Sequence, residues 1–153
     1  MIEPLIADKA KEALTQAVIK TFEEMAFIDV VESSAVSGNL KYENGFCIDL
    51  LKPISSKIIL FLSEGLKKKI VENIFSTDTE SLEVSQGDDC ILEILNVLAG
   101  KFLSAYYGKN IEYKLEFPQV FMDLDEKDEY ISVNLNAEGF DCKIILNTIR
   151  YRY

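Results

Sequence analysis

The sequence has no histidine and no tryptophan, and its 153 residues include only three cysteines, Cys47, Cys90 and Cys142. Without histidine, the Ser-His-Asp and Cys-His schemes of nucleophilic catalysis are excluded, together with the commonest zinc sites. The cysteines are widely spaced and form no C-x-x-C pair, which is typical of reduced, mostly buried thiols. Any chemistry must therefore use carboxylates, amides, hydroxyls, lysines or the groups of a partner.

Basic residues are also scarce. The 16 lysines and arginines face 26 acids, which gives a net charge of −10. Because binding to a phosphate backbone needs many cations, nucleic acid is not expected as a partner. The basic cluster LKKKI (residues 66–70) is interpreted as the solvated side of a short helix rather than as a binding patch.

Long apolar runs are missing too, since none approaches the roughly 20 residues that span a bilayer. The N-terminal residues MIEPLIADKAKEALTQAVIK are amphipathic with early acids and lack the design of a signal peptide. We therefore expect a cytoplasmic protein with no membrane association. The length and composition predict one globular domain over residues 1–153.

Motifs for phosphate and metal binding are absent from the sequence. There is no G-x-G-x-x-G pattern and no P-loop. The acidic tract DLDEKDE (residues 123–129) does not fit an EF-hand, because its fifth and sixth positions are Lys127 and Asp128. It is interpreted as a solvated loop, and we expect the protein to have no cofactor or metal of its own.

The order of patterns predicts an α+β fold, with long helices packed on a mostly antiparallel sheet. Helices are expected over residues 1–27 and 64–75, and over a stretch that ends before Gly108. Strands are expected over residues 45–51, 57–63, 111–117, 129–137 and 140–149. Turns are expected at Lys52-Pro53 and at Glu138-Gly139.

The stretch DDCILEILNVLAG (residues 88–100) has an unusual distribution of polar residues. On a helical wheel, Asp89, Glu93, Asn96 and Gly100 fall within about 60° of one another. The opposite side carries an ordinary core-facing set, namely Ile91, Ile94, Leu95, Leu98, Phe102 and Ala105. An exposed glycine inside a helix costs roughly 1 kcal/mol relative to alanine, but it bares the backbone to another surface. A solvent-facing helix without a special role remains the alternative interpretation.

The pattern Asp89-x-x-x-Glu93-x-x-Asn96-x-x-x-Gly100 resembles the signature of the CheC, CheX and FliY phosphatases of bacterial chemotaxis. The segment TFEEMAFIDV (residues 21–30) and the order of elements as far as Phe121 are also similar to this family. The first helix contains no Glu-x-x-Asn, and a single motif helix resembles CheX more closely than CheC.

The resemblance implies a hydrolase that removes the aspartyl phosphate of a phosphorylated CheY-like response regulator in chemotaxis or related two-component signalling. Asn96 would position the attacking water, Glu93 would engage the regulator's lysine, and Asp89 and Gly100 would belong to the docking ridge. Mg²⁺ would be bound by the regulator, and a homodimer could form through sheet edges. The alternative is a non-catalytic CheX-like module that docks on a receiver domain or a flagellar switch component.

The chemistry of the two side chains agrees with these roles. An aspartyl phosphate is an activated mixed anhydride, so its hydrolysis needs positioning and charge neutralisation more than a strong nucleophile. A carboxamide both donates and accepts hydrogen bonds and can hold a water in line with phosphorus. A carboxylate can accept a charge-assisted hydrogen bond from an ammonium group.

Overall fold

The computed structural model describes residues 4–33, 42, 44–76, 84–121, 130–148 and 151–152. The acidic tract at residues 123–129 lies outside them. In chain order the elements are β1 (Leu5–Ile6), α1 (Ala7–Thr21), the π-helical turn η1 (Phe22–Ala26), β2 (Val30–Glu32), β3 (Asn44–Lys52), β4 (Ser56–Leu62), α2 (Glu64–Phe75), α3 (Val84–Tyr107), β5 (Lys114–Leu115), β6 (Gln119–Val120), β7 (Tyr130–Ala137), β8 (Phe140–Asn147) and β9 (Tyr151–Arg152).

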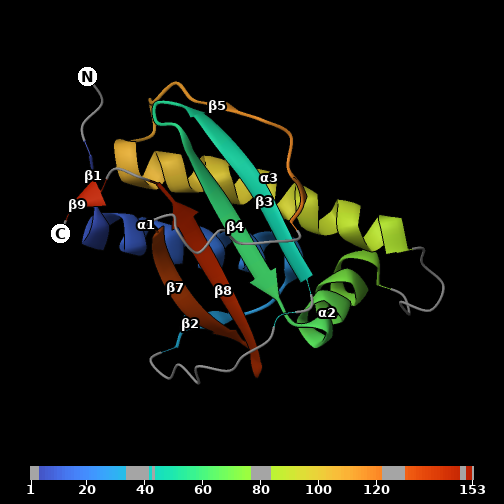
Figure 1. Cartoon of the computed structure of the whole chain (residues 1–153). Coiled ribbons are helices and arrows are strands. Elements are labelled where there is room, and N and C mark those ends of the chain that lie inside the picture. Colours follow the sequence, from blue (N-terminus) through green and yellow to red (C-terminus); the bar gives the residue numbers. More distant parts are fainter. Residues whose placement is uncertain are drawn as a thin grey trace.

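Seven strands form one antiparallel sheet in the order β2-β7-β8-β4-β3-β5, with β6 also paired to β3 (Figure 1). The short strands β1 and β9 pair in parallel away from this sheet. The α+β class with a mostly antiparallel sheet is therefore confirmed.

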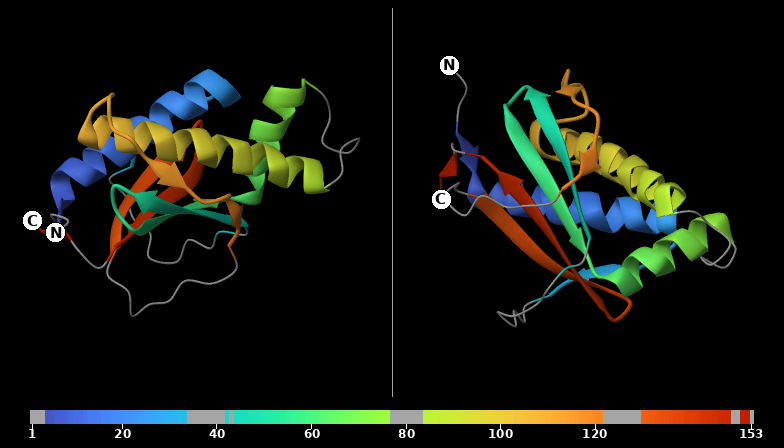
Figure 2. Two further views of the ribbon diagram at one scale, coloured as in Figure 1. Left: turned by 90° about the horizontal axis from the view of Figure 1, so that it is seen from above. Right: turned by 45° about the vertical axis from the view of Figure 1, so that its right-hand side comes forward.

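The two long helices α1 and α3 lie side by side over one face of the sheet and run in opposite directions, while α2 lies near the end of β4 (Figure 2). The main core fills the space between the helices and the sheet. Its largest fully buried side chains include Phe22, Phe46 and Phe102.

Strand β4, whose sequence is almost continuously apolar, is covered on both faces. Ile58 and Leu60 belong to the main core, whereas Ile59 packs with Cys47 and Ile145 in a second cluster. The rings of Phe61 and Phe121 pack against this second cluster.

The predicted turns are confirmed. β3 and β4 form a hairpin around Lys52-Pro53, and β7 and β8 pair with Ala137 opposite Phe140. Between them Glu138 and Gly139 both have positive φ, of 49° and 95°, as a tight hairpin turn of this handedness needs. Gly108 has a φ of 105°, and its N–H donates to the Ser104 carbonyl, so it ends α3 as predicted.

Two predictions about element boundaries are wrong. The first helix begins at Ala7, because Leu5 and Ile6 follow Pro4 in extended conformation and pair with residues 151–152. The expected strand at 111–117 is instead the two-residue strand β5, and β6 follows after Pro118, which has no N–H for a sheet ladder.

Helix α3 is the one helix in the described chain that is long and apolar enough to cross a bilayer, over Gln86–Tyr107. Half of that stretch is buried inside the protein, where it packs against α1 and β3. Its apolar composition is therefore that of a core helix.

Candidate active site

The polar side chains singled out in the sequence lie on the outer surface of α3. Asp89, Glu93 and Asn96 are all exposed, and none of them has a hydrogen bond or ion pair with the described residues. The opposite side of the helix is in the core, where these residues are fully buried: Ile91, Ile94, Leu95, Leu98 and Phe102. Ala105, which the wheel assigned to the core side, is exposed beside a groove. We refer to Asp89, Glu93 and Asn96 as the ridge.

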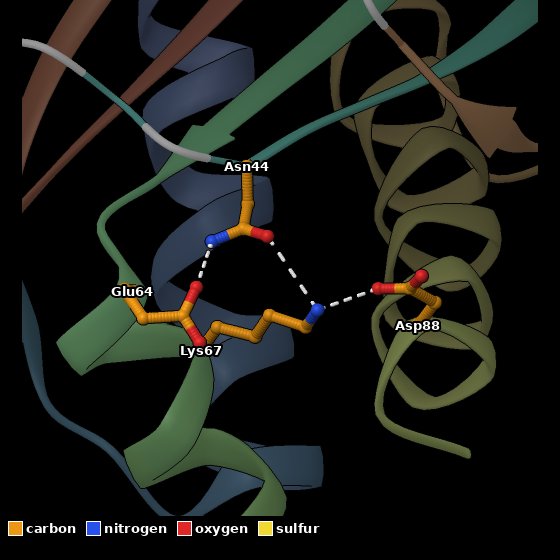
Figure 3. Close-up of polar contacts among 4 residues, drawn as sticks. All are labelled: Asn44, Glu64, Lys67 and Asp88. Atoms are coloured by element: carbon orange, nitrogen blue, oxygen red, sulfur yellow. Dashed lines mark hydrogen bonds and ion pairs between the residues drawn. The ribbon is translucent and has the colours of Figure 1, made fainter. Parts of the chain in front are cut away.

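A polar network fixes the N-terminal half of α3 and therefore the position of the ridge (Figure 3). Lys67 of α2 forms an ion pair with Asp88 of α3 at 2.6 Å and contacts the Asn44 side-chain oxygen at 3.5 Å. The Asn44 amide nitrogen donates to Glu64 at 2.8 Å. The two adjacent aspartates therefore have different surroundings: Asp88 forms an ion pair within the protein, whereas Asp89 faces solvent.

Gly100 is buried rather than exposed, which corrects the expectation of a bare stretch of helix backbone. The residue is buried, and a Cβ atom placed on it would lie 2.8 Å from the Tyr113 hydroxyl. The glycine allows the Tyr113 side chain, itself 47% exposed, to lie against α3. The wheel gave its direction correctly but could not show that a later segment of the same chain covers it.

A groove of about 550 Å³ runs beside the ridge between α1, α3 and the segment that leads to β5. Asn96 is the first residue of α3 to line it, so the amide stands at one end of the groove. The walls also include Lys20 of α1, Lys101 of α3, and Lys109 and Tyr113 beyond α3. The groove is open to solvent, and Glu93 does not line it.

An ion pair joins the groove to the end of the first helix. Lys101 contacts Glu24 of η1 at 2.7 Å, and both side chains are partly exposed. Such a pair adds at most about 1 kcal/mol to stability, so its main effect is on the position of the lysine. The sequence reasoning missed Lys101, Lys20 and Tyr113 as parts of the site. Only Lys101 had a local signal, because it follows the signature directly.

The cysteines do not provide a reactive nucleophile. Burial raises the pKa of the Cys47, Cys90 and Cys142 thiols, that of Cys142 to about 12. The thiolate form that attacks substrates is therefore disfavoured at neutral pH. Within the described ranges, histidine, cysteine and acidic side chains form no group of three that could hold a metal ion.

This arrangement allows the side chains of Glu93 and Asn96 to contact groups in a binding site of a macromolecular partner. Residues three apart on a helix have Cβ atoms about 5–6 Å apart, so Glu93 and Asn96 can touch neighbouring groups of one partner. The helix that carries them is rigid because its inner side is buried and Asp88 is tied to α2. A rigid element holds reacting groups more accurately than a loop does.

Comparison with known proteins identifies the family of the chain. Residues 45–143 match the model of the family described as chemotaxis phosphatase CheX. No curated protein matches the sequence.

Solved structures with the same fold include the CheX of Vibrio vulnificus, with a TM-score of 0.75 and 12% identity over 91% of this chain and 98% of that one. The CheX of Desulfovibrio desulfuricans gives a TM-score of 0.74 and 14% identity, over 90% and 97% of the two chains. A CheX-CheY-BeF3-Mg²⁺ complex from Borrelia burgdorferi gives 0.65 and 11%, over 89% and 95%. At such identities the structures establish the fold, and the family match establishes membership: the chain belongs to the CheX chemotaxis phosphatase family.

Proposed function

We propose that the protein hydrolyses the aspartyl phosphate of a CheY-like response regulator in chemotaxis or related two-component signalling. The observation that carries this proposal is the pair of exposed side chains, Glu93 and Asn96, unpaired within the described chain and one helical turn apart. In a family of chemotaxis phosphatases, an amide and a carboxylate presented in this way are suited to enter the active site of the regulator.

Asn96 is assigned the catalytic role. Its carboxamide can accept a hydrogen bond from the attacking water and donate one to a phosphoryl oxygen, which aligns the water with phosphorus. No group of this chain has to form a covalent intermediate. The phosphoryl group passes to water, and the Asp side chain of the regulator is released as a carboxylate.

Glu93 is assigned to docking. Its carboxylate can accept a charge-assisted hydrogen bond from a lysine of the regulator and so fix the register of the complex. Asp89, one turn earlier and also exposed, extends this acidic contact. Gly100 is not assigned to docking, because Tyr113 covers it.

Mg²⁺ is assigned to the regulator, where it neutralises charge on the phosphoryl group. The CheX and CheY of Borrelia burgdorferi form a complex that contains Mg²⁺ and BeF3. This chain contributes the amide and the carboxylate.

The deciding experiment follows acyl-phosphate decay in a panel of CheY-like regulators with and without the protein, in parallel with binding of each regulator. Acceleration of decay by catalytic amounts supports the phosphatase. Binding with unchanged decay would instead identify the chain as a docking module.

We also propose that the protein acts in the cytoplasm as a homodimer through sheet edges. β2 lies at one end of the seven-stranded order, and Val31 on it is 61% exposed. Sedimentation of the wild-type protein and of a Val31→Lys variant tests this, since a charge at a paired edge should give monomers.

A further inference from the structure

The groove beside Asn96 has a charge opposite to that of the whole molecule. In a chain with a net charge of −10, three lysines line it, namely Lys20, Lys101 and Lys109. The described lining residues include no aspartate or glutamate. A cationic groove on an acidic protein attracts anions.

The sign of the charge changes along α3 at the catalytic amide. Asp88, Asp89 and Glu93 precede Asn96, whereas Lys101 follows it. Lys20, in the last turn of α1, and Lys109, just beyond α3, extend the basic side. Asn96 therefore stands at the boundary between an acidic ridge and a basic groove.

Two of the three lysines are available to a ligand. Lys20 and Lys109 are exposed and have no hydrogen bond or ion pair with the described part of the chain. Lys101 is held by Glu24 at 2.7 Å. Exposed cations that meet no intramolecular carboxylate are open to an acidic partner.

We propose that this groove binds a carboxylate-bearing segment of the response regulator while its phosphorylated aspartate reaches Asn96. The inference rests on the proposed function and adds a second contact of opposite sign. The regulator would present a lysine to Glu93 and an acidic segment to the lysines. Such alternation of charge selects one orientation of the partner.

The spacing of the lysines favours a segment over a single ion. From Asn96 to the end of α3 at Tyr107 the helix rises about 16 Å, and Lys109 lies beyond that end. A bound phosphate ion needs donors that converge within hydrogen-bond distance. Cations spread along a groove match several carboxylates on an extended surface.

The test uses the full-length protein and a CheY-like regulator that it dephosphorylates. Lys20→Glu and Lys109→Glu, singly and together, are compared with Lys11→Glu on α1 and Lys68→Glu on α2, which are exposed and outside the groove. Binding is measured with the regulator loaded with Mg²⁺ and beryllium fluoride, and turnover with the phosphorylated form.

We expect the double groove variant to raise Kd and KM roughly tenfold, with a smaller change in kcat and a weaker dependence of Kd on salt. The two control variants should match the wild type. Equal effects of groove and control reversals would show only general repulsion and would overturn the inference. So would wild-type Kd in the double variant.

Inorganic phosphate tests whether the groove binds a free anion instead of a segment of the regulator. If millimolar phosphate inhibits the wild type but not the double groove variant, the groove binds free phosphate and the proposed segment contact is wrong. Failure of the proposed function looks different: no regulator is bound or dephosphorylated by the wild type, and this inference then falls with it.

Discussion

At the scale of single residues, the exposure of Asn96 allows its proposed catalytic role to be tested separately from folding. Its side chain packs in no core, so truncation to alanine opens no cavity. Asn96→Ala should lower kcat roughly 100-fold, about 2.7 kcal/mol in the barrier, because a positioning group is lost. Acyl-phosphate decay measures the effect, and the melting temperature should be unchanged. Asn110→Ala, which removes an exposed amide beyond α3, is the matched control. If Asn96→Ala keeps wild-type turnover, Asn96 does not have the assigned catalytic role.

Glu93 should affect binding as well as turnover. In Glu93→Lys a cation would meet the lysine of the regulator in a desolvated contact, and like charges there weaken the complex. We expect a Kd at least tenfold higher, while Glu12→Lys, an exposed reversal on α1, should bind normally. Unchanged affinity of Glu93→Lys would argue against the pairing.

Gly100 and Tyr113 form a pair whose coupling can be measured. Alanine is the better helix former by roughly 1 kcal/mol, but its Cβ would lie 2.8 Å from the Tyr113 hydroxyl. Gly100→Ala alone should therefore change stability little. In a Tyr113→Ala background the same substitution should stabilise the fold by up to about 1 kcal/mol in urea unfolding. Equal effects in both backgrounds would mean that Tyr113 is not the obstacle.

The sequence predicted the directions of the side chains on α3, except that of Ala105, but not their surroundings. Periodicity was sufficient to place Asp89, Glu93 and Asn96 outside and Leu95 inside. It could not show that Tyr113 folds back over Gly100, since that contact depends on the path of the chain after Gly108. The groove lysines could not be predicted for the same reason. They lie in α1, in α3 and beyond α3, and only the fold brings them to one groove.

At the scale of elements, α3 is fastened to α2 by one partly buried ion pair. Lys67→Ala would leave Asp88 without its cation, and its side chain is only 27% exposed. We expect unfolding free energy to fall by about 1–2 kcal/mol, compared with almost no change for Lys68→Ala on the exposed side of α2. Urea denaturation measures both. If the Lys67→Ala/Asp88→Ala double variant recovers none of the lost unfolding free energy, the two side chains are not energetically coupled.

Hairpins were predictable because their signals are local. Glu138-Gly139 and Lys52-Pro53 each lie between two apolar strands that pair directly with each other. The start of α1 and the division into β5 and β6 were not predictable, because a pairing partner 146 residues away at Tyr151 and the edge of β3 decide them.

At the scale of the whole molecule, the buried thiol of Cys142 and the half-buried phenol of Tyr107 make stability depend on pH in the alkaline range. Burial raises the pKa of Cys142 from 9.0 to about 12 and that of Tyr107 from 10.0 to about 12. The unfolded chain therefore releases these protons at lower pH than the folded protein does. Stability is fully present below about pH 9 and is lost as the pH rises towards 12.

Thermal melts across this range should show a falling melting temperature, with a shallower slope in Cys142→Ala. The slope is compared rather than the absolute value, because the substitution also leaves a small cavity. A slope unchanged by the substitution would contradict the assignment to Cys142.

The pairing of β1 with β9 has a practical consequence for experiments on this protein. Leu5 lies opposite Tyr151, and the Ile6 N–H donates to the Tyr106 hydroxyl at 2.9 Å, so both ends of the fold meet beside the C-terminal end of α3 (Figure 1). Tyr106 follows Asn96 by ten residues, about 15 Å along the helix. A fluorophore or surface tether attached at either end therefore stands clear of Asp89 and Glu93, which lie farther along. Immobilised protein should keep its ridge accessible to a regulator, whereas Lys109 lies just beyond the same end of α3, so an attachment there should hinder the proposed groove contact first.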